Sequence, residues 1–435
     1  VVPSYPLQSG GRIAPNVLFI LDDSGSMEST FMPDAVPQTT VDGTNFNISN
    51  STYARNTIYY NPAVTYEPWV DATGAPMTGG MDYGSVYNNV EFLTDNVNLA
   101  GSDRSFYVPK DLSNTAESYL SNTANYYRYQ IRTDGTVIRS ELMFGVSGQQ
   151  GLTGSGCSNS NNGWQWKNCV RDTPVTPATS TASAVHRSEA EERRNFATWW
   201  SYSRTRMKVA KGSAGRAFND LGTNVRVGFR TIWQKGLAGN LITQAAPIPV
   251  GRNNGFFDNP NGVDGADNNR TLWYQRLYGA DAGGGTPLHG ALNDAGRYFS
   301  SSAAGGPYGP QVGAAQFACR QNFTILTTDG YWNGKDNYAT PVNEQDNVAG
   351  SEITRPAGDP YTYTPVRPYR SADSDTLADV AMRYWKSDLR TDLENTVPSS
   401  ASDPAFWQHM TTFAISIGAK GTLDPKTDLP AITSG

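Results

Sequence analysis

Oxygen-bearing side chains gather near the start of the chain, at the point where a short apolar run ends. In the stretch Asn16-Val-Leu-Phe-Ile-Leu-Asp-Asp-Ser-Gly-Ser-Met27, the residues Asp22, Ser24 and Ser26 occupy alternate positions directly after the apolar run. Carboxylate and hydroxyl oxygens are ligands that a hard divalent cation such as Mg²⁺ or Ca²⁺ takes. The spacing therefore predicts part of a metal site on a tight loop.

Two later segments offer the remaining ligands. Thr286 lies in Gly283-Gly-Gly-Thr-Pro-Leu288 and opens a predicted helix, and Asp329 ends a second apolar run in Thr327-Thr-Asp-Gly330. With the first loop they supply two carboxylates and three hydroxyls, a set that balances the charge of a divalent cation and leaves a coordination position open. Such a cation is expected to accept a carboxylate from another molecule. The alternative is a turn whose Asp and Ser side chains only cap the next helix.

The elements that would position these residues alternate between strands and helices. Apolar or alternating runs predict strands, and helical periodicity predicts helices. The predicted strands are 17–22, 225–233, 322–329 and 410–418, and the predicted helices are 188–221, 270–278, 286–299 and 375–393. Ser188 and Glu191 resemble a capping box at the start of the first helix. This order predicts an α/β fold with a doubly wound, mostly parallel sheet, which places ligands at the carboxyl ends of its strands.

The segment between the first strand and the first helix follows a different pattern. Residues 28–187 are rich in turn signals and aromatic residues, with short strand-like pieces at 57–60 and 139–144. Because this aromatic content is too high for a solvated linker, we expect a large insertion of loops and short strands. Residues 1–15 are expected to form an exposed lead-in, and residues 240–247 are a candidate antiparallel partner for the strand that precedes them.

The composition suits a secreted surface protein. Charged residues make up 17% of the chain, against about 25% in a typical domain, and the net charge is −6. No basic run of five or more residues occurs, which argues against nucleic-acid binding, and no apolar stretch reaches the roughly 18 residues of a membrane span. The chain begins at Val1 without a signal-peptide pattern, which fits a mature secreted product.

The cysteines allow one local disulfide. Cys157 and Cys169 lie close together in a Gly/Asn/Ser-rich stretch, whereas Cys319 is distant. In an oxidising compartment we expect Cys157 and Cys169 to pair, which would contribute roughly 3 kcal/mol on the chain-entropy account. The alternative is two free thiols in a flexible loop. Cys319 precedes an apolar run and is expected to be a buried thiol.

The sequence lacks the motifs of the enzyme classes that it partly resembles, and we expect a protein that is not an enzyme. A haloacid-dehalogenase-type phosphatase needs a second acid where Ser24 stands, and no Gly-x-Ser-x-Gly nucleophile elbow occurs. The histidines have no metal-ligand spacing: they are His186, His289 and His409. The acidic stretch 258–267 lacks the terminal Glu of an EF-hand and is expected to be a solvated turn. Asp373 and Asp375 are expected to cap the helix that begins beside them.

The order of the oxygen-bearing residues resembles the metal-ion-dependent adhesion site of von Willebrand factor A domains. That family carries Asp-x-Ser-x-Ser, then a distant Thr, then a distant Asp. The matching positions here are Asp22, Ser24, Ser26, Thr286 and Asp329. The resemblance implies a von Willebrand factor A-like domain formed by residues 16–27 and 188–435. The chain departs from the family pattern in its insertion, residues 28–187, because the first helix of the family usually follows the Ser loop almost directly.

With this long insertion before its first helix, the chain resembles more specifically the PilY family of bacterial type IV pilus tip-associated adhesins. Phrases similar to the N-terminal half of that family include Tyr60-Asn-Pro-Ala-Val-Thr-Tyr-Glu-Pro-Trp69, Asn195-Phe-Ala-Thr-Trp-Trp-Ser-Tyr202 and Asn322-Phe-Thr-Ile-Leu-Thr-Thr-Asp-Gly-Tyr-Trp-Asn333. The resemblance implies adhesion and the initiation of pilus assembly with minor pilins. It also implies Mg²⁺ or Ca²⁺ at the adhesion site, with the carboxylate of a host or surface receptor completing the metal shell.

The same resemblance implies an extracellular location at the pilus tip on the cell surface, reached through the periplasm. The C-terminal β-propeller of the family is not expected in this chain. The alternative function is a structural assembly module. In that role the metal only stabilises the fold, and minor pilins bind the insertion or the edge of the sheet.

Overall fold

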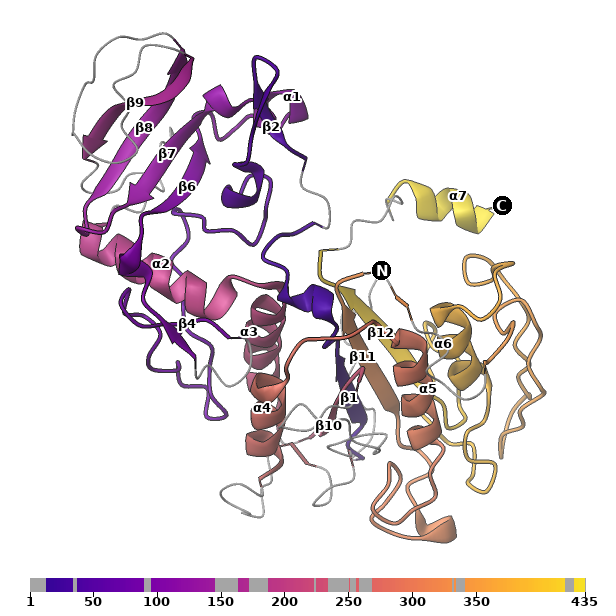
Figure 1. Cartoon of the computed structure of the whole chain (residues 1–435). Coiled ribbons are helices and arrows are strands. Elements are labelled where there is room, and N and C mark those ends of the chain that lie inside the picture. Colours follow the sequence, from indigo (N-terminus) through magenta and orange to yellow (C-terminus); the bar gives the residue numbers. More distant parts are fainter. Residues whose placement is uncertain are drawn as a thin grey trace. The chain divides into compact units, whose positions relative to one another are not determined.

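The computed structural model describes most of the chain (Figure 1). The described residues are 13–33, 37–89, 95–144, 163–171, 187–222, 224–233, 250, 256–257, 268–330, 332–333, 341–418 and 426–434. The chain divides into two compact units: residues 1–27 with 217–435 form the first, and residues 28–216 form the second. Several predictions lie outside the described residues, namely those for residues 1–12, Cys157, His186, 240–247 and 258–267.

A parallel sheet of four strands forms the centre of the first unit. The strands lie in the order β10, β1, β11, β12, and each neighbouring pair is parallel. Their bounds are β1 (Asn16–Leu21), β10 (Arg226–Thr231), β11 (Asn322–Thr328) and β12 (Thr411–Ser416). Every residue of β1 is buried, as expected for a central strand covered on both faces. The predicted α/β class and the predicted strands at these positions are confirmed.

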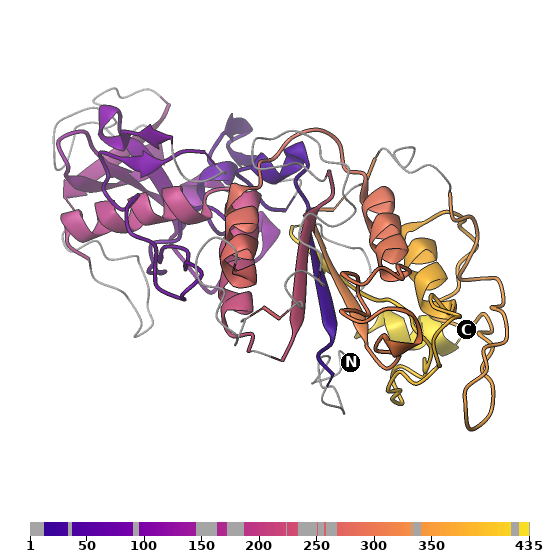
Figure 2. The same ribbon diagram turned by 90° about the horizontal axis from the view of Figure 1, so that it is seen from below.

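Helices cover both faces of this sheet (Figure 2). The helices of the unit are α4 (Asn269–Gly279), α5 (Leu288–Phe299), α6 (Leu377–Lys386) and α7 (Asp428–Ser434), together with the end of α3 (Arg206–Asn219). Leu18 of β1 shares a buried core with Tyr384 of α6. Successive residues of a strand face opposite sides, and the Phe19 ring lies 5.2 Å from Phe218 and 5.8 Å from Trp273 on the other face.

Two elements of the first unit differ from the sequence-based expectation. β12 is predicted to be a buried strand, but it lies at the edge of the sheet, and Ile415 is 49% exposed. An apolar run by itself does not distinguish an edge strand from a central one. The helix predicted to run to residue 393 ends at Lys386, because the chain then turns and the Leu389 N–H donates to the Gln408 carbonyl.

The N-terminus of α6 is capped by Thr376 and not, as predicted, by Asp373 or Asp375. The Thr376 hydroxyl accepts a hydrogen bond from the Asp379 N–H, and the Asp379 carboxylate accepts one from the Thr376 N–H, which completes a capping box. Asp375 instead has a left-handed φ of 59°. Its carboxylate accepts a hydrogen bond from the Val342 N–H, so it holds a neighbouring loop.

Two helices replace the single helix predicted at residues 188–221. They are α2 (Glu189–Ser203) and α3 (Arg206–Asn219). The predicted capping box is confirmed, because Ser188 and Glu191 each accept a hydrogen bond from the other's N–H. The break falls at Thr205. The Thr205 hydroxyl accepts a hydrogen bond from the Lys208 N–H and so caps the N-terminus of α3. The apolar stripe continues across this break, so periodicity alone predicts one helix.

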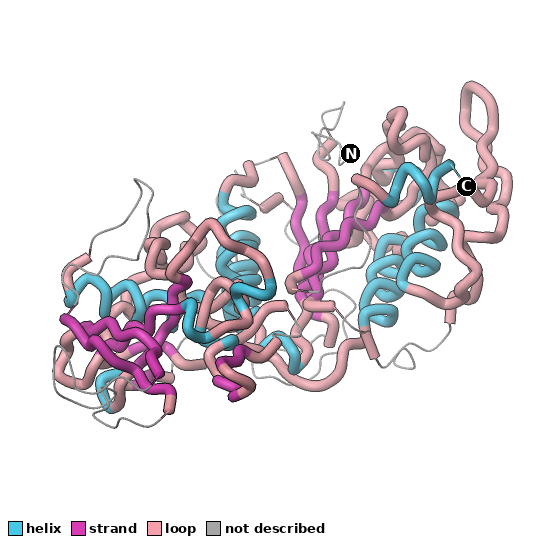
Figure 3. Tube along the Cα trace, turned by 90° about the horizontal axis from the view of Figure 1, so that it is seen from above, coloured by secondary structure: helices cyan, strands magenta, loops and turns pink. Residues whose placement is uncertain are grey.

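An antiparallel sheet of four strands forms the frame of the second unit (Figure 3). The sheet order is β6 (Arg104–Pro109), β7 (Tyr126–Ile131), β8 (Val137–Phe144) and β9 (Trp164–Arg171), and the unit also contains β2 (Thr39–Val41), β3 (Thr44–Phe46), β4 (Val86–Tyr87), β5 (Asn96–Val97) and α1 (Glu117–Leu120). The strand-like piece predicted at 139–144 is confirmed within β8. The piece predicted at 57–60 is wrong, because these residues form turns.

Helix α2 packs its aromatic side chains against this sheet. Phe196 and Trp199 share a buried core with Tyr60, Phe106 and Tyr129, and the Phe106 and Tyr129 rings stack with centroids 5.3 Å apart. The predicted domain boundary precedes α2, whereas the compact unit includes it. The helix belongs to this unit because its largest apolar residues have their contacts there.

A carboxylate is buried in the same core. Glu192 of α2 is 0% exposed, accepts a hydrogen bond from the Tyr60 hydroxyl and lies 3.5 Å from Arg187 Nη1. Burial raises the pKa of Glu192 to about 7, although the Tyr60 hydrogen bond and the Arg187 charge oppose the shift. Arg187 also donates to the carbonyls of Pro62 and Val64. It therefore keeps hydrogen-bond partners when Glu192 is neutral.

The free energy of unfolding of the second unit should fall as the pH rises from about 5 to about 8. The raised pKa of Glu192 means that the folded state holds this proton more tightly than the unfolded chain. The stabilisation is therefore complete below about pH 4.5 and is lost as the pH passes through about 7. Glu192→Gln should remove this dependence. Urea unfolding of wild type and variant at a series of pH values checks it, and identical slopes would show that Glu192 is not the titrating group.

Candidate metal centre

The carboxylate of Asp22 is fixed at the carboxyl end of β1. The Asp22 N–H donates to the Thr327 carbonyl at 3.1 Å, which continues the pairing with β11. Its Oδ1 accepts a hydrogen bond from the Ser24 N–H at 2.8 Å, and its Oδ2 accepts one from the Thr328 hydroxyl at 2.7 Å. The Asp22 side chain is thus held by its own loop and by β11, and the residue is 0% exposed.

The two serine hydroxyls link this loop to the end of β11. Ser24 Oγ and Ser26 Oγ lie 3.0 Å apart, and the Ser26 hydroxyl donates to Asp329 Oδ1 at 2.9 Å. Ser24 and Asp329 are buried, whereas Ser26 is exposed. The row of oxygens therefore runs from a buried carboxylate to the surface of the unit.

The glycine-rich loop that carries Thr286 is attached to the same place. The Gly25 N–H donates to the Gly284 carbonyl at 3.0 Å, and the Gly283 N–H donates to the Asp23 carbonyl at 2.8 Å. The Thr286 N–H donates to Asn333 Oδ1 at 2.6 Å. Asn333 belongs to the segment that follows β11, so the loop is tied to both of the other segments. Thr286 itself is 4% exposed and precedes α5 by two residues.

The electrostatics of the site favour a bound cation. Burial raises the pKa of Asp22, and the nearby charge of Asp329 raises it further, against hydrogen bonds from Ser24 and Thr328 that lower it. Ionising Asp22 here therefore costs free energy that a divalent cation bound at this site would offset. The donor set, carboxylates and hydroxyls, is also the chemistry that Mg²⁺ and Ca²⁺ prefer. The residues present thus fit the predicted metal, whose binding stays a prediction.

The five sequence-predicted residues lie on segments that are hydrogen-bonded to one another. Four of the five are joined by side-chain hydrogen bonds, directly or through a neighbour: Asp22, Ser24, Ser26 and Asp329. Thr286 is brought to the site through the backbone of its loop. Sequence reasoning did not single out Thr328 or Asn333. Thr328 is adjacent to Asp329 at the end of β11, and its position next to a predicted ligand is a signal that could have identified it. No spacing rule identifies Asn333.

Gly285→Ala should weaken metal binding without a substitution of any predicted ligand. A Cβ at Gly285 would lie 2.3 Å from Asn333 Oδ1, so the hydrogen bond that holds Thr286 must shift. We expect the Mg²⁺ affinity to fall by about tenfold, as for the loss of an outer-shell partner. Isothermal titration of Gly285→Ala and Gly305→Ala checks this, since nothing lies within 4 Å of a Cβ at Gly305. Equal affinities in the two variants would contradict the role of the Gly285–Asn333 contact.

The histidines and cysteines lie in other contexts. His289 is buried with its ring centroid 4.3 Å from that of Trp332, and His409 Nε2 lies 3.3 Å from Asp403 Oδ2. Cys169 is disulfide-bonded, and Cys319 is a half-buried free thiol, not the fully buried one predicted. Among the described residues, no helix combines the length and apolarity that a membrane crossing requires.

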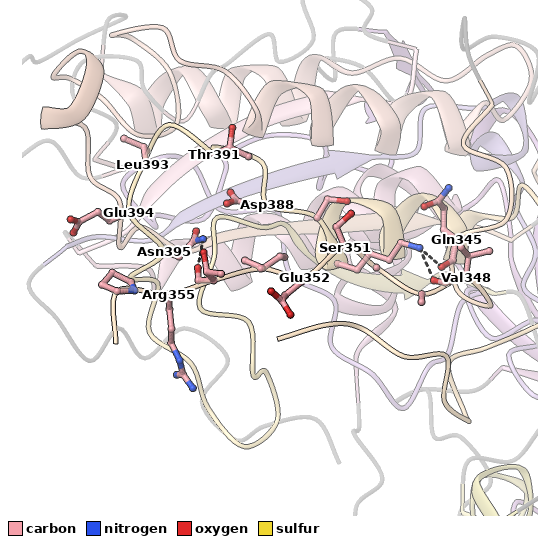
Figure 4. A pocket seen from close by; sticks show the side chains of 17 residues that line it. Gln345, Val348, Ser351, Glu352, Arg355, Asp388, Thr391, Leu393, Glu394 and Asn395 are labelled. Carbon is pink, nitrogen blue, oxygen red and sulfur yellow. Dashed lines mark hydrogen bonds between the residues drawn. The ribbon is translucent and has the colours of Figure 1, made fainter. Parts of the chain in front are cut away.

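A cavity of about 840 Å³ opens elsewhere in the first unit (Figure 4). It is lined by residues 348–356 and by side chains that follow α6, among them Asp388, Glu394 and Asn395. Burial raises the pKa of Asp388 despite hydrogen bonds from the backbone of Arg390 and the side chain of Asn395. None of the predicted metal ligands lines this cavity.

Comparison with known proteins finds relatives by sequence. No protein-family model matches the chain, and no solved structure matches it. The chain is 27% identical over 439 residues to the type IV pilus biogenesis factor PilY1 of Pseudomonas aeruginosa strain UCBPP-PA14, an alignment that covers 97% of this chain and 33% of the relative. It is also 27% identical over 457 residues to PilY1 of strain PAK, with 100% of this chain and 34% of the relative covered.

The alignments define how far the similarity extends. The chain spans about a third of the length of the curated relatives that it matches. Within that third, the aligned region includes nearly every residue of this chain. Similarity along the whole chain therefore supports its relationship to the PilY family, which the shared sequence phrases predicted.

Proposed function

We propose that this chain is a metal-dependent adhesion and pilus-assembly domain at the tip of a bacterial type IV pilus, outside the cell. The observation that carries the proposal is the hydrogen-bonded row from Asp22 through Ser24 and Ser26 to Asp329, in which the Ser26 residue is exposed. The pilus context comes from the names of the PilY1 relatives. The domain is von Willebrand factor A-like, with the second unit as its insertion, and it has no catalytic role.

The proposed mechanism uses the two carboxylates and three hydroxyls of the site. Asp22, Ser24, Ser26, Thr286 and Asp329 would hold Mg²⁺ or Ca²⁺, directly or through water. The protein supplies a charge of −2 there, so the site stays attractive to one more anionic ligand. The Asp or Glu carboxylate of a minor pilin or surface receptor completes the shell. The exposed position of Ser26 leaves room for that ligand on the side that faces solvent.

Metal dependence of partner binding tests the proposal. Purified minor pilins should bind the immobilised chain in the presence of Mg²⁺ or Ca²⁺. A chelator should abolish this binding, and readdition of the metal should restore it. The unfolding temperature is measured in both buffers, so that a loss of fold can be separated from a loss of contact. Binding that persists in chelator while the unfolding temperature falls would overturn the adhesion-site mechanism and favour a purely structural metal.

A structural assembly module is the second candidate function, and a feature of the second unit favours it. Phe144 at the end of β8 is 60% exposed, and Val170 of β9 is 37% exposed. β9 is the terminal strand of this sheet among the residues that the structure describes, and the edge of a sheet is where a strand of another protein can be added. In this role, pilins would pair with that edge and cover Phe144. Phe144→Asp should then weaken pilin binding, and it should leave binding unchanged under the metal-dependent mechanism.

A further inference from the structure

Three carboxylates converge in the first unit, away from the candidate metal centre. Glu344 and Asp346 lie on the loop that leads toward the cavity, and Asp379 lies in the first turn of α6. One oxygen from each of these residues lies within 4.8 Å of the others. Asp346 is 1% and Asp379 is 0% exposed, whereas Glu344 is half-buried. Like charges at this separation repel one another strongly when they are shielded from water.

The carboxylate of Asp379 is an acceptor at both oxygens. Its Oδ1 accepts hydrogen bonds from the N–H groups of Gln345 at 2.7 Å and Asp346 at 3.2 Å. Its Oδ2 accepts from the N–H of Thr376 at 2.8 Å and from the Thr376 hydroxyl at 2.9 Å. All four partners are donors, so Asp379 is held in its ionised form and fixes the loop to the start of α6.

The carboxylate of Asp346 is only half satisfied. Its Oδ1 accepts a hydrogen bond from the Ser371 N–H at 2.7 Å. Its Oδ2 is buried and has no hydrogen-bond partner among the described residues. A buried carboxylate oxygen without a hydrogen-bond partner has lost its contact with water and gained nothing in exchange. Asp346 Oδ2 belongs to the cluster of three carboxylates. Its missing partner therefore points to a ligand that carboxylate oxygens bind, such as a cation.

The ammonium group of Lys386 lies near these carboxylates, but its hydrogen bonds go to backbone oxygens. Lys386 Nζ donates to the carbonyl oxygens of Gln345 at 2.7 Å and Val348 at 2.9 Å, and Figure 4 labels both of these residues at the cavity wall. The charges of Asp379, Glu344 and Asp346 all act on Lys386, but its hydrogen bonds go to the backbone. Three carboxylates and one ammonium leave a charge of −2, which a single divalent cation balances.

We propose that Glu344, Asp346 and Asp379 form a second cation site that binds Ca²⁺. The ligands are oxygens held on an irregular loop and a helix terminus. Ca²⁺ accepts such flexible sets of six to eight oxygens, whereas Mg²⁺ requires near-octahedral geometry. Asp346 Oδ2 gains the partner that it lacks, and water completes the shell. The cation would tie the loop at residues 342–348 to α6, and this role does not depend on the proposed adhesion site.

Terbium luminescence gives a readout that is local to this site, because Tb³⁺ replaces Ca²⁺ and is excited through nearby aromatic rings. The Tyr363 hydroxyl donates to the Asp346 carbonyl at 2.6 Å, and the Trp385 ring centroid lies 6.1 Å from that of Tyr363. The experiment uses the whole chain carrying Asp22→Asn, so that the candidate metal centre binds only at much higher Tb³⁺ concentration. We expect saturable Tb³⁺ luminescence that Ca²⁺ displaces and that added Asp346→Asn removes. Equal luminescence with and without Asp346→Asn, or none in the parent, would overturn the proposal.

Thermal unfolding of the same proteins excludes a trivial loss of fold. Asn at position 346 retains an oxygen for the Ser371 N–H and removes a buried charge, so Asp346→Asn should unfold in chelator at a temperature no lower than its parent. Ca²⁺ should raise the unfolding temperature of the parent and of the exposed control Asp359→Asn, but not of Asp346→Asn. Glu344→Gln, at the half-buried ligand, should weaken Ca²⁺ binding by about tenfold, since ligand charge sets the affinity of such sites. Unchanged Ca²⁺ affinity in both ligand variants would refute the site.

Discussion

Asp22→Asn is expected to weaken Mg²⁺ or Ca²⁺ binding at the candidate metal centre by about a hundredfold, or close to 3 kcal/mol. The substitution removes one of the two carboxylates and keeps the shape of the side chain. An Asn Oδ1 can still accept from the Ser24 N–H, and its amide can donate to the Thr328 oxygen, so the loop geometry observed in the wild type is preserved. Isothermal titration with each metal measures the change.

The stability of the metal-free protein should move in the opposite direction. Burial and the charge of Asp329 raise the pKa of Asp22, so an ionised Asp22 destabilises the metal-free fold. A neutral Asn removes that penalty, and Asp22→Asn should be at least as stable as wild type in chelator. At a metal concentration of about 100 times the wild-type Kd, the wild type should gain about 2.7 kcal/mol, whereas a variant with hundredfold weaker binding should gain only about 0.4 kcal/mol.

The pairing of these two measurements separates a metal ligand from a structural residue. A purely structural Asp22 would give a variant that is less stable in chelator and is still stabilised by metal. Asp220→Asn is the matched control, because Asp220 is an exposed residue of the same unit. It should keep both the affinity and the stabilisation of the wild type. Equal metal affinities for wild type and Asp22→Asn would exclude the candidate metal centre.

The candidate metal centre could be predicted from the sequence because each part is local. Parallel strands end at the same edge of a sheet, and β1 and β11 are neighbours, with Ile20 paired to Leu326. The residues that follow these two strands are Asp22 and Asp329. They therefore lie close together, and the positions of the other strands do not affect this. The glycine-rich loop before Thr286 signals a close backbone approach, and the structure shows it in the Gly25–Gly284 hydrogen bond.

The features that sequence reasoning missed depend on contacts between distant segments. The second acidic group joins Glu344 and Asp346 to Asp379, which a spacing rule cannot connect because no repeat or helical period relates them. The end of α6 at Lys386 is set by pairing with a segment near Gln408. The exposure of Ile415 is set by the strand order. In the last two cases tertiary structure overrides a local apolar pattern.

Trp199→Ala is expected to destabilise the second unit by about 3–5 kcal/mol, the range for truncation of a buried large aromatic side chain. Trp199 is 1% exposed, and its ring centroid lies 5.0 Å from those of Tyr59 and Phe196. Its indole N–H donates to the Ile58 carbonyl at 2.9 Å. The substitution leaves a cavity and an unpaired buried carbonyl, and these two costs add.

Urea unfolding of the whole chain, followed by far-ultraviolet circular dichroism, measures this loss. A typical domain has about 5–15 kcal/mol of stability, and the urea m-value is about 1–3 kcal/mol/M, so the midpoint of the affected transition should fall by about 2 M. Phe144→Ala is the control, because Phe144 is 60% exposed, and it should change stability by less than about 0.5 kcal/mol. A midpoint shift for Trp199→Ala no larger than that of Phe144→Ala would show that the α2 core does not hold this unit together.

Because Trp199 has its contacts in the second unit, the same experiment reports on cooperativity between the units. If each unit unfolds as its own cooperative transition, Trp199→Ala should lower one midpoint and leave Mg²⁺-dependent stabilisation of the other in place. An insertion that folds on its own core can vary its surface without disturbing the metal ligands, which lie on the other unit. Loss of Mg²⁺ stabilisation in Trp199→Ala would instead mean that the candidate metal centre requires the folded second unit.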